Sequence, residues 1–200
     1  LVNYSYDNIY LFDTSVRMDG SSKFGSDKKF APFWSFGAGL NIHNYKYFKE
    51  LGVFDLLKLR ASYGQVGKVN FASYDAKTTY RILSDQWYKT GYGAVLYALG
   101  NKGLTWETTN TLDVGLEVSL LKNLLYLKGS YYVKRTVDCI NSVTIPSHSG
   151  FITYMDNIGE IENKGFELDV RANVVRTQDW NLNLFANLSH NKNRLVKIAE

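Results

Sequence analysis

The chain has 200 residues, a net charge of +4 and a single cysteine, Cys139. Its basic residues are scattered along the sequence, so we expect no nucleic-acid partner. One cysteine excludes an intrachain disulfide and a cysteine-rich metal site, and no stretch approaches the ~18 apolar residues of a transmembrane helix. Many aromatic residues (15 Tyr, 11 Phe, 4 Trp) and 16 Gly beside only 2 Pro favour β-structure with tight turns.

Apolar and polar residues alternate in seven segments, and strict alternation predicts a β-strand with one apolar and one polar face. The segment GFELDVRANVV shows the pattern: Phe166, Leu168 and Val170 are apolar, whereas Glu167 and Asp169 between them are charged. In chain order the predicted strands cover residues 10–19, 34–42, 56–64, 111–119, 124–135, 165–175 and 180–191, with a partial strand near residues 2–6.

Short and long connections separate these predicted strands. Tight turns are expected at residues 121–123 and 176–179, and the link at 43–55 has room for one turn of helix. The long connections are expected at residues 64–103 and 141–161, with a modest turn at 20–30. In an up-and-down meander, alternate connections lie at opposite ends, so the short ones gather at one end and the long ones at the other. This arrangement is typical of outer-membrane barrels.

The apolar faces fit two architectures. In a soluble sandwich they would form the core, and in a transmembrane barrel they would face lipid. The alternating runs reach the ~9–11 residues that cross a bilayer at a tilt, whereas globular strands average roughly five or six. Aromatic residues also stand near the ends of the apolar faces, as in membrane-interface girdles: Tyr10, Trp34, Tyr63, Tyr131 and Trp180.

We therefore predict an all-β fold, an antiparallel up-and-down transmembrane β-barrel segment of about seven or eight strands. The alternative is a soluble all-β carbohydrate-binding module. The two differ in solubility without detergent.

Four motifs resemble the C-terminal barrel region of SusC/RagA-type TonB-dependent outer-membrane transporters of Bacteroidetes. They are VRMDGSSKFG (16–25), LLKLRASYGQVG (56–67), GLTWETTNTLDVGLEVSLLKN (103–123) and NIGEIENKGFELDV (157–170). The resemblance runs from about Tyr10 to Asn193, with the motifs in the expected order. One departure is the pair Lys68-Val69, where the family often has glycine and asparagine. The motifs favour the SusC group over siderophore receptors, a nearby alternative.

The resemblance implies a roughly 22-stranded barrel in which residues 1–200 form part of one barrel domain. The plug domain and the TonB box are expected outside this chain, which begins without Met and reads as a fragment. Such transporters lie in the Gram-negative outer membrane, in contact with its lipid, and import oligosaccharides or peptides. They use force from the TonB complex and pair with a SusD-type surface lipoprotein. The resemblance implies no cofactor and no enzymatic activity.

The long connection 64–103 is rich in aromatic residues and carries the candidate substrate site. Flat aromatic faces stack on sugar rings, and nearby polar groups bind hydroxyl or peptide groups. The candidate residues are Trp87, Tyr88, Tyr92 and Tyr97. Alternatively, these side chains pack the connection onto the barrel rim or onto the lid lipoprotein. Residues 151–156 are a second, weaker candidate.

No catalytic set or metal site is expected. His43, His148 and His190 lie in or beside turns and far apart in sequence, and no His/Cys/Asp group has metal-ligand spacing. Glu160 and Glu162 are two residues apart and would share one face of a strand. A position on the lumen wall or in a turn accounts for the two carboxylates without a role in acid–base catalysis. Cys139 is expected to be a buried or lipid-facing small apolar residue.

Overall fold

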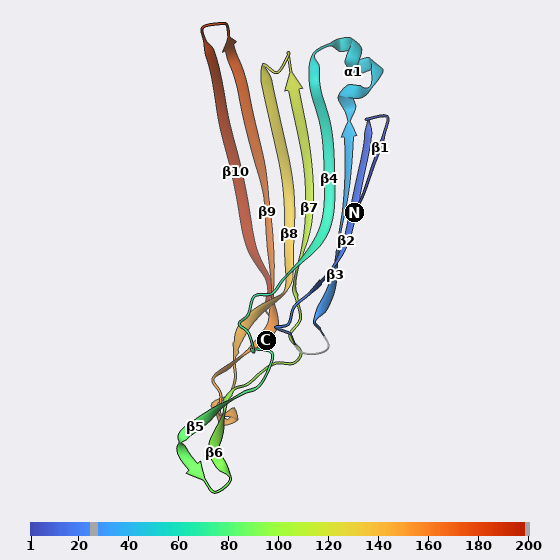
Figure 1. Cartoon of the computed structure of the whole chain (residues 1–200). Coiled ribbons are helices and arrows are strands. Elements are labelled where there is room, and N and C mark those ends of the chain that lie inside the picture. The colour runs from blue at the N-terminus through green and yellow to red at the C-terminus, as the bar shows by residue number, and fades with distance from the viewer. Residues whose placement is uncertain (25–27, 199–200) are drawn as a thin grey trace.

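The computed structural model describes residues 1–24 and 28–198 of the chain. An eight-stranded antiparallel sheet has the order β1-β2-β3-β4-β7-β8-β9-β10, and a separate hairpin pairs β5 with β6 (Figure 1). The sheet strands are β1 (Val2–Tyr6), β2 (Tyr10–Gly20), β3 (Phe30–Asn41), β4 (Phe54–Lys68), β7 (Glu107–Leu120), β8 (Leu125–Thr144), β9 (Thr153–Arg176) and β10 (Asn181–Ile198). The hairpin is β5 (Thr79–Tyr88) with β6 (Gly91–Ala98). The predicted all-β meander is confirmed, including the partial first strand.

The sheet strands extend beyond the predicted segments at the end with the long connections. The predicted long connection at 141–161 is wrong, because β8 continues to Thr144 and β9 begins at Thr153. Asn141 pairs with Asp156 and Ser142 with Met155 in this extension. Backbone hydrogen bonds maintain the ladder there although the side chains no longer alternate, so hydropathy alone missed it. The predicted turn at 20–30 includes residues 25–27, which lie outside the described residues.

The two ends of the sheet differ in their connections (Figure 1). At one end lie tight turns and the short helices η1 (Ile42–Asn44) and α1 (Lys46–Leu51), which confirm the predicted turn of helix. Gly52, at φ 62°, takes the left-handed conformation that ends α1. At the other end lie the β5–β6 hairpin and the β8–β9 connection with the short helix η2 (Ser147–Ser149). Among the described residues no helix has the length and apolar character needed to cross a membrane.

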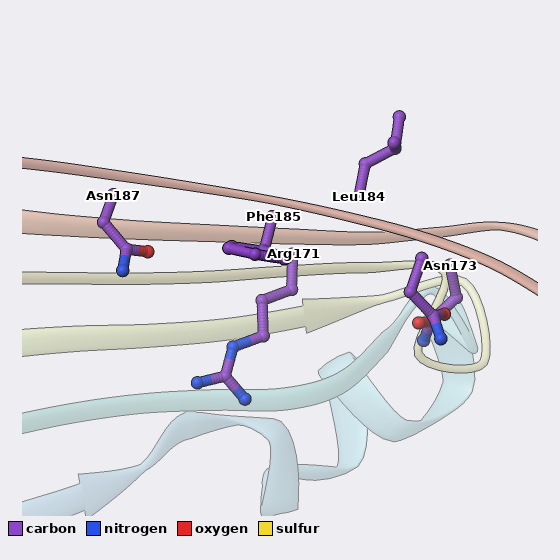
Figure 2. Close-up of a pocket in the computed structure, with 6 residues that line it drawn as sticks. Arg171, Asn173, Leu184, Phe185 and Asn187 are labelled. Carbon is purple, nitrogen blue, oxygen red and sulfur yellow. The ribbon is translucent and has the colours of Figure 1, made fainter.

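Each strand of the sheet contributes to one apolar and one polar face. On the polar face, the Arg60 guanidinium lies 3.5 Å from an Asp113 carboxylate oxygen and 3.6 Å from one of Glu117. Figure 2 shows the same division near β9 and β10: Leu184 points away from the side on which Arg171 lies. Phe185 is an exception, since it pairs with Arg171 on the polar face.

The apolar residues form a band that crosses the sheet obliquely. On β9 the band ends at Phe166, because the next residue on that face is Lys164. Directly paired residues lead from Phe166 across the sheet to Phe12 on β2. On β2, however, the band ends only at Met18, six positions closer to the long connections than Phe12. The directly paired residues are Phe166, Tyr131, Val114, Ala61, Ala38 and Phe12. An offset of about one residue per strand is what a strand tilt of roughly 35–45° requires for a level band.

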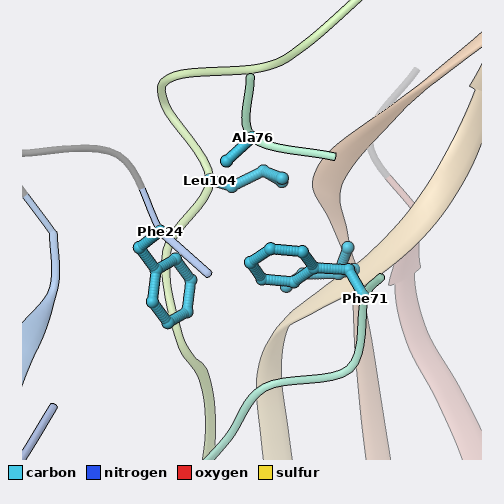
Figure 3. Close-up of a cluster of buried hydrophobic side chains, with 5 residues drawn as sticks. Phe24, Phe71, Ala76 and Leu104 are labelled. Carbon is cyan, nitrogen blue, oxygen red and sulfur yellow. The ribbon is translucent and has the colours of Figure 1, made fainter. Parts of the chain in front are cut away.

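A buried cluster lies at the long-connection end and not in the middle of the sheet (Figure 3). Phe24 and Leu104 are fully buried, and Phe71, Ala76 and Ile140 complete the cluster. The Phe24 and Phe71 rings meet edge to face at 5.0 Å between centroids. These residues come from four separate connections or strand ends, so the cluster holds the long connections together.

Candidate functional site

A groove of about 850 Å³ opens at the long-connection end. One wall is the base of the β5–β6 hairpin with the segment before it, which contributes Tyr74, Asp75 and Tyr97. The other wall is the β8–β9 connection with the first residues of β9, and these contribute Ile152 and Tyr154. The groove therefore joins two segments that lie far apart in the sequence.

Side-chain amides fasten the two walls together. The Asn101 Nδ2 donates to the Met155 carbonyl at 3.0 Å and to the Asp156 Oδ1 at 2.9 Å. The Asn157 side chain accepts from the Thr105 N–H at 2.9 Å and donates to the Thr105 carbonyl at 3.1 Å. These hydrogen bonds satisfy backbone and carboxylate groups and tie the segment after β6 to the first residues of β9, next to the groove.

The groove combines aromatic rings with charged groups. The Tyr154 hydroxyl donates to the Asp156 Oδ2 at 2.9 Å, and this hydrogen bond raises the pKa of Tyr154, which lies well beyond the apolar band. Tyr74 is held at φ 80°, an unusual conformation for a residue with a Cβ, and its ring is largely exposed. Lys77 and Asp75 supply one positive and one negative group. This set can stack on a flat ligand and bind its polar groups.

Of the four predicted binding residues, only Tyr97 lines the groove. Trp87 pairs with Tyr92, so these two share one hairpin face, whereas Tyr88 pairs with Gly91 on the other face. Tyr97 shares that second face with Arg81, whose guanidinium lies 5.9 Å from the centre of its ring. The exposed fractions are 76% for Trp87, 60% for Tyr88, 61% for Tyr92 and 65% for Tyr97.

Sequence reasoning missed Asp75 and Lys77 as members of this site, and it did not select Tyr74 among the aromatic residues of the long connection. The second candidate segment, residues 151–156, does reach it and lies opposite Tyr97. A single sequence contains no signal for that proximity, because it depends on how far β8 and β9 extend before they turn.

The other candidate chemistry is dispersed. His43 lies in η1, His148 in η2 and His190 inside β10, so the prediction that all three lie in or beside turns is wrong for His190. Its strand continues past the alternating segment to Ile198. Across residues 1–24 and 28–198, no group of three or more His, Cys, Asp or Glu side chains could hold a metal ion. Cys139 is buried, as predicted, and its thiol contacts the Thr136 carbonyl at 3.7 Å.

Glu160 and Glu162 lie on one face of β9, as their spacing predicts, but not on a lumen wall or in a turn. They share the face of Phe166 and Leu168, which is the apolar face. Both have basic partners there, Arg135 and Lys164.

Comparison with known proteins gives one consistent result. The family described as TonB dependent receptor-like, beta-barrel matches residues 1–197. The chain is 35% identical over 203 residues to TonB-dependent receptor P3 of Formosa agariphila, covering 100% of this chain and 20% of that protein. It is 32% identical over 204 residues to TonB-dependent receptor SusC of Bacteroides thetaiotaomicron, covering 99% of this chain and 20% of that protein.

Solved structures agree with these sequence matches. The RagAB peptide transporter superposes with a TM-score of 0.88 at 30% identity, over 98% of this chain and 22% of that chain. The RagAB peptide importer in its closed-closed state gives 0.90 at 30% identity, over 99% and 22%. The chain therefore spans about a fifth of the length of the proteins it matches.

Proposed function

Because the chain belongs to the TonB-dependent receptor-like β-barrel family, we propose that it forms part of the barrel wall of a SusC/RagA-type nutrient importer in the outer membrane. The whole protein would import oligosaccharides or peptides with energy from the TonB complex and with a SusD-type surface lipoprotein as partner. Residues 1–200 would lie within one barrel domain, and the plug domain and TonB box would belong to the rest of the protein.

The oblique apolar band is the observation that carries this proposal. Its offset from strand to strand fits a tilted barrel wall, and aromatic rings stand near its edge, where Trp34 and Tyr63 meet at 5.5 Å between centroids. The soluble alternative needs a second layer over the apolar face, and the described residues place none there. The band would face lipid, and charged residues such as Arg60 and Asp113 would face the lumen.

We assign the groove to substrate binding on the outside of the cell. Outer-membrane barrels carry their long connections on that side, and the groove offers aromatic faces beside Asp75 and Lys77. A saccharide would stack on Tyr74 or Tyr97, and a peptide would use the same rings together with the charged pair. The structural neighbour RagAB is a peptide transporter, so a peptide is one of the two classes to test.

The other hairpin face is the proposed contact with the lipoprotein lid. Tyr80, Ile82, Trp87 and Tyr92 are exposed. Their pairing places them on one face of the hairpin: Tyr80 pairs with Leu96, Ile82 with Ala94 and Trp87 with Tyr92. An isolated two-stranded hairpin is marginal in water, so a partner over this apolar face would stabilise it.

Uptake by whole cells tests the proposal. A strain without the gene is complemented with the full-length protein and supplied separately with defined mixtures of oligosaccharides and peptides. We expect one class to be taken up only when TonB is functional, and we expect Tyr97→Ala to reduce this uptake about tenfold, by analogy with the loss of one stacking contact. Tyr47→Ala, an exposed tyrosine in α1, serves as the control. Uptake of neither class, or uptake that does not need TonB, would contradict the proposal.

Co-purification tests the lid contact separately. Trp87→Ala combined with Tyr92→Ala should reduce recovery of the surface lipoprotein with the transporter, because both side chains lie on the proposed contact face. Val95→Ala on the opposite hairpin face should leave recovery unchanged.

A further inference from the structure

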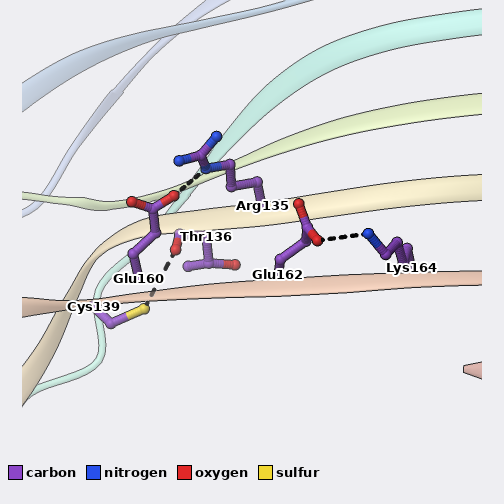
Figure 4. A network of polar contacts seen from close by, with 6 residues as sticks. All are labelled: Arg135, Thr136, Cys139, Glu160, Glu162 and Lys164. Carbon is purple, nitrogen blue, oxygen red and sulfur yellow. Dashed lines mark hydrogen bonds and ion pairs between the residues drawn. The ribbon is translucent and has the colours of Figure 1, made fainter. Parts of the chain in front are cut away.

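A cluster of charged side chains continues the apolar face directly beyond the end of the band. It consists of basic residues from β8, β9 and β10 with two glutamates of β9, and we call it the cationic patch. Its members are Arg135, Lys164, Lys192, Arg194 and Lys197 with Glu160 and Glu162. Figure 4 shows the β8 and β9 members projecting from the same side of these strands.

The two glutamates do not balance the five basic residues. Arg135 is hydrogen-bonded to Glu160, and the Lys164 Nζ lies 3.0 Å from the Glu162 Oε1. On β10, Arg194 and Lys197 are the register partners of these same glutamates. The patch therefore retains a net charge of about +3 after all internal pairing, taking Lys and Arg as fully charged.

Lys192 lies directly opposite Lys164 across the β9–β10 ladder. Like charges at directly opposed positions destabilise a sheet unless an anion lies between them. The side chains are long enough to reach outward together, as lysines do at membrane interfaces. The Glu162 carboxylate beside Lys164 offsets only one of these two charges, so the pair favours a further negative ligand on the apolar-face side.

The polar face at the same level lacks this charge. The row behind the patch consists of Lys134, Asn163 and Asn193, with one cation and two neutral amides. Positive charge is thus concentrated on the side that carries the apolar band. Next to the cationic patch, the Phe166 and His190 rings lie 5.9 Å apart between centroids and form the edge of the apolar band.

We propose that the cationic patch binds the phosphate groups of anionic lipid headgroups in the external leaflet of the membrane. The inference rests on the proposed outer-membrane function. Guanidinium groups form paired hydrogen bonds with phosphate, and ammonium groups supply point charges. The apolar band next to the patch, on the side away from the long connections, contacts the acyl chains of the same lipid. The protein thus binds the charged headgroup with the patch and the apolar chains with the band.

Lipid retention by the full-length transporter tests this inference. The purified protein in detergent is mixed with equal amounts of bisphosphorylated lipid A and its dephosphorylated form, and retained lipid is measured by native mass spectrometry. We expect selective retention of the phosphorylated lipid. In the triple variant Lys164→Gln, Lys192→Gln and Arg194→Gln, retention should fall on the order of a hundredfold, since three basic contacts are lost. Lys134→Gln, on the opposite face at the same level, is the matched control.

Three results would overturn the inference: equal retention by the triple variant, equal retention of the dephosphorylated lipid, or complete displacement by excess inorganic phosphate. The last would identify a free-phosphate site. Heat-dependent gel mobility verifies that each variant is a folded barrel. Outer-membrane location and uptake are measured on the same proteins. Absence of the wild type from the outer membrane would reject the proposed function, whereas normal location and uptake with unchanged lipid retention would reject this inference alone.

Discussion

The sheet and the long-connection end bury apolar side chains in different ways. In the sheet, the band leaves residues such as Val16 71% exposed, and the strands are held by their backbone ladders. At the long-connection end, Phe24 and Leu104 are completely buried among segments from several parts of the chain. The first region needs an apolar phase outside the protein, and the second has its own core. The difference indicates where lipid ends and water begins.

Leu104→Ala should have the largest effect, because it leaves a cavity in the only cluster that organises the long connections of the described chain. Comparable substitutions cost about 2–5 kcal/mol. We expect the β5–β6 hairpin and its flanks to become sensitive to limited proteolysis in the full-length protein while the barrel stays folded. Leu99→Ala, a more exposed leucine in the same connection, is the control. Protease resistance equal to the wild type would contradict the role of this core.

Val170→Arg, in the middle of the apolar positions of β9, tests the other side of the comparison. A charged residue at the middle of a lipid-facing band costs about 2–4 kcal/mol. The measurement is the free energy of unfolding of the full-length protein in lipid vesicles, obtained by denaturant titration. Asn187→Arg on the polar face should cost far less, because that residue pairs with Asp169. Similar costs for the two variants would show that the two faces do not have different surroundings.

Asn101→Ala should affect the groove rather than the barrel. It removes the two hydrogen bonds to Met155 and Asp156 and leaves their oxygens without this donor, at a cost of about 1–3 kcal/mol. We expect faster hydrogen exchange in the β8–β9 connection and weaker substrate uptake. Asn70→Ala, an exposed asparagine in the connection between β4 and β5, should change neither. Normal exchange in Asn101→Ala would mean that the two walls are held in another way.

Tyr154→Phe should have the smallest effect, and this effect should depend on pH. The hydrogen bond to Asp156 raises the pKa of Tyr154 in the folded protein. Its contribution is therefore complete below the ordinary tyrosine pKa of about 10 and is lost as the pH rises through the higher folded value. Hydrogen exchange near the groove should differ between the wild type and Tyr154→Phe at neutral pH and converge in strong alkali. A constant difference across this range would contradict the assignment.

The sequence predicted the sheet well because each strand has an environment that repeats every second residue. Leu112, Val114 and Leu116 alternate with charged or small residues, and the structure pairs them with apolar partners on both sides. The signal fades where both faces meet water. At the long-connection end, β8 and β9 extend to residues such as Asn141 and Asp156, which pair through backbone hydrogen bonds without an alternating side-chain pattern.

The candidate site was less predictable for the same reason. The aromatic residues of the long connection were evident, but their distribution over two hairpin faces depends on a register shift between Leu83 and Trp87. The proximity of Tyr97 and Ile152 depends on the length of strands that are distant in the chain. The charged residues beyond Phe166 were visible in the sequence, yet the meeting of Arg135, Glu162 and Arg194 on one face follows only from the registers of β8 and β10 with β9.

The central claim is that the apolar face contacts lipid and the polar face contacts water. The direct test places single spin labels at positions 166 to 171 of the full-length protein, with Cys139→Ser as background, in native outer membranes. We predict that even positions are accessible to oxygen and odd positions to a water-soluble nickel reagent, in a period of two. Equal accessibility of even and odd positions would contradict the account. So would even positions that are shielded from both oxygen and nickel, because those side chains would then lie in a protein core.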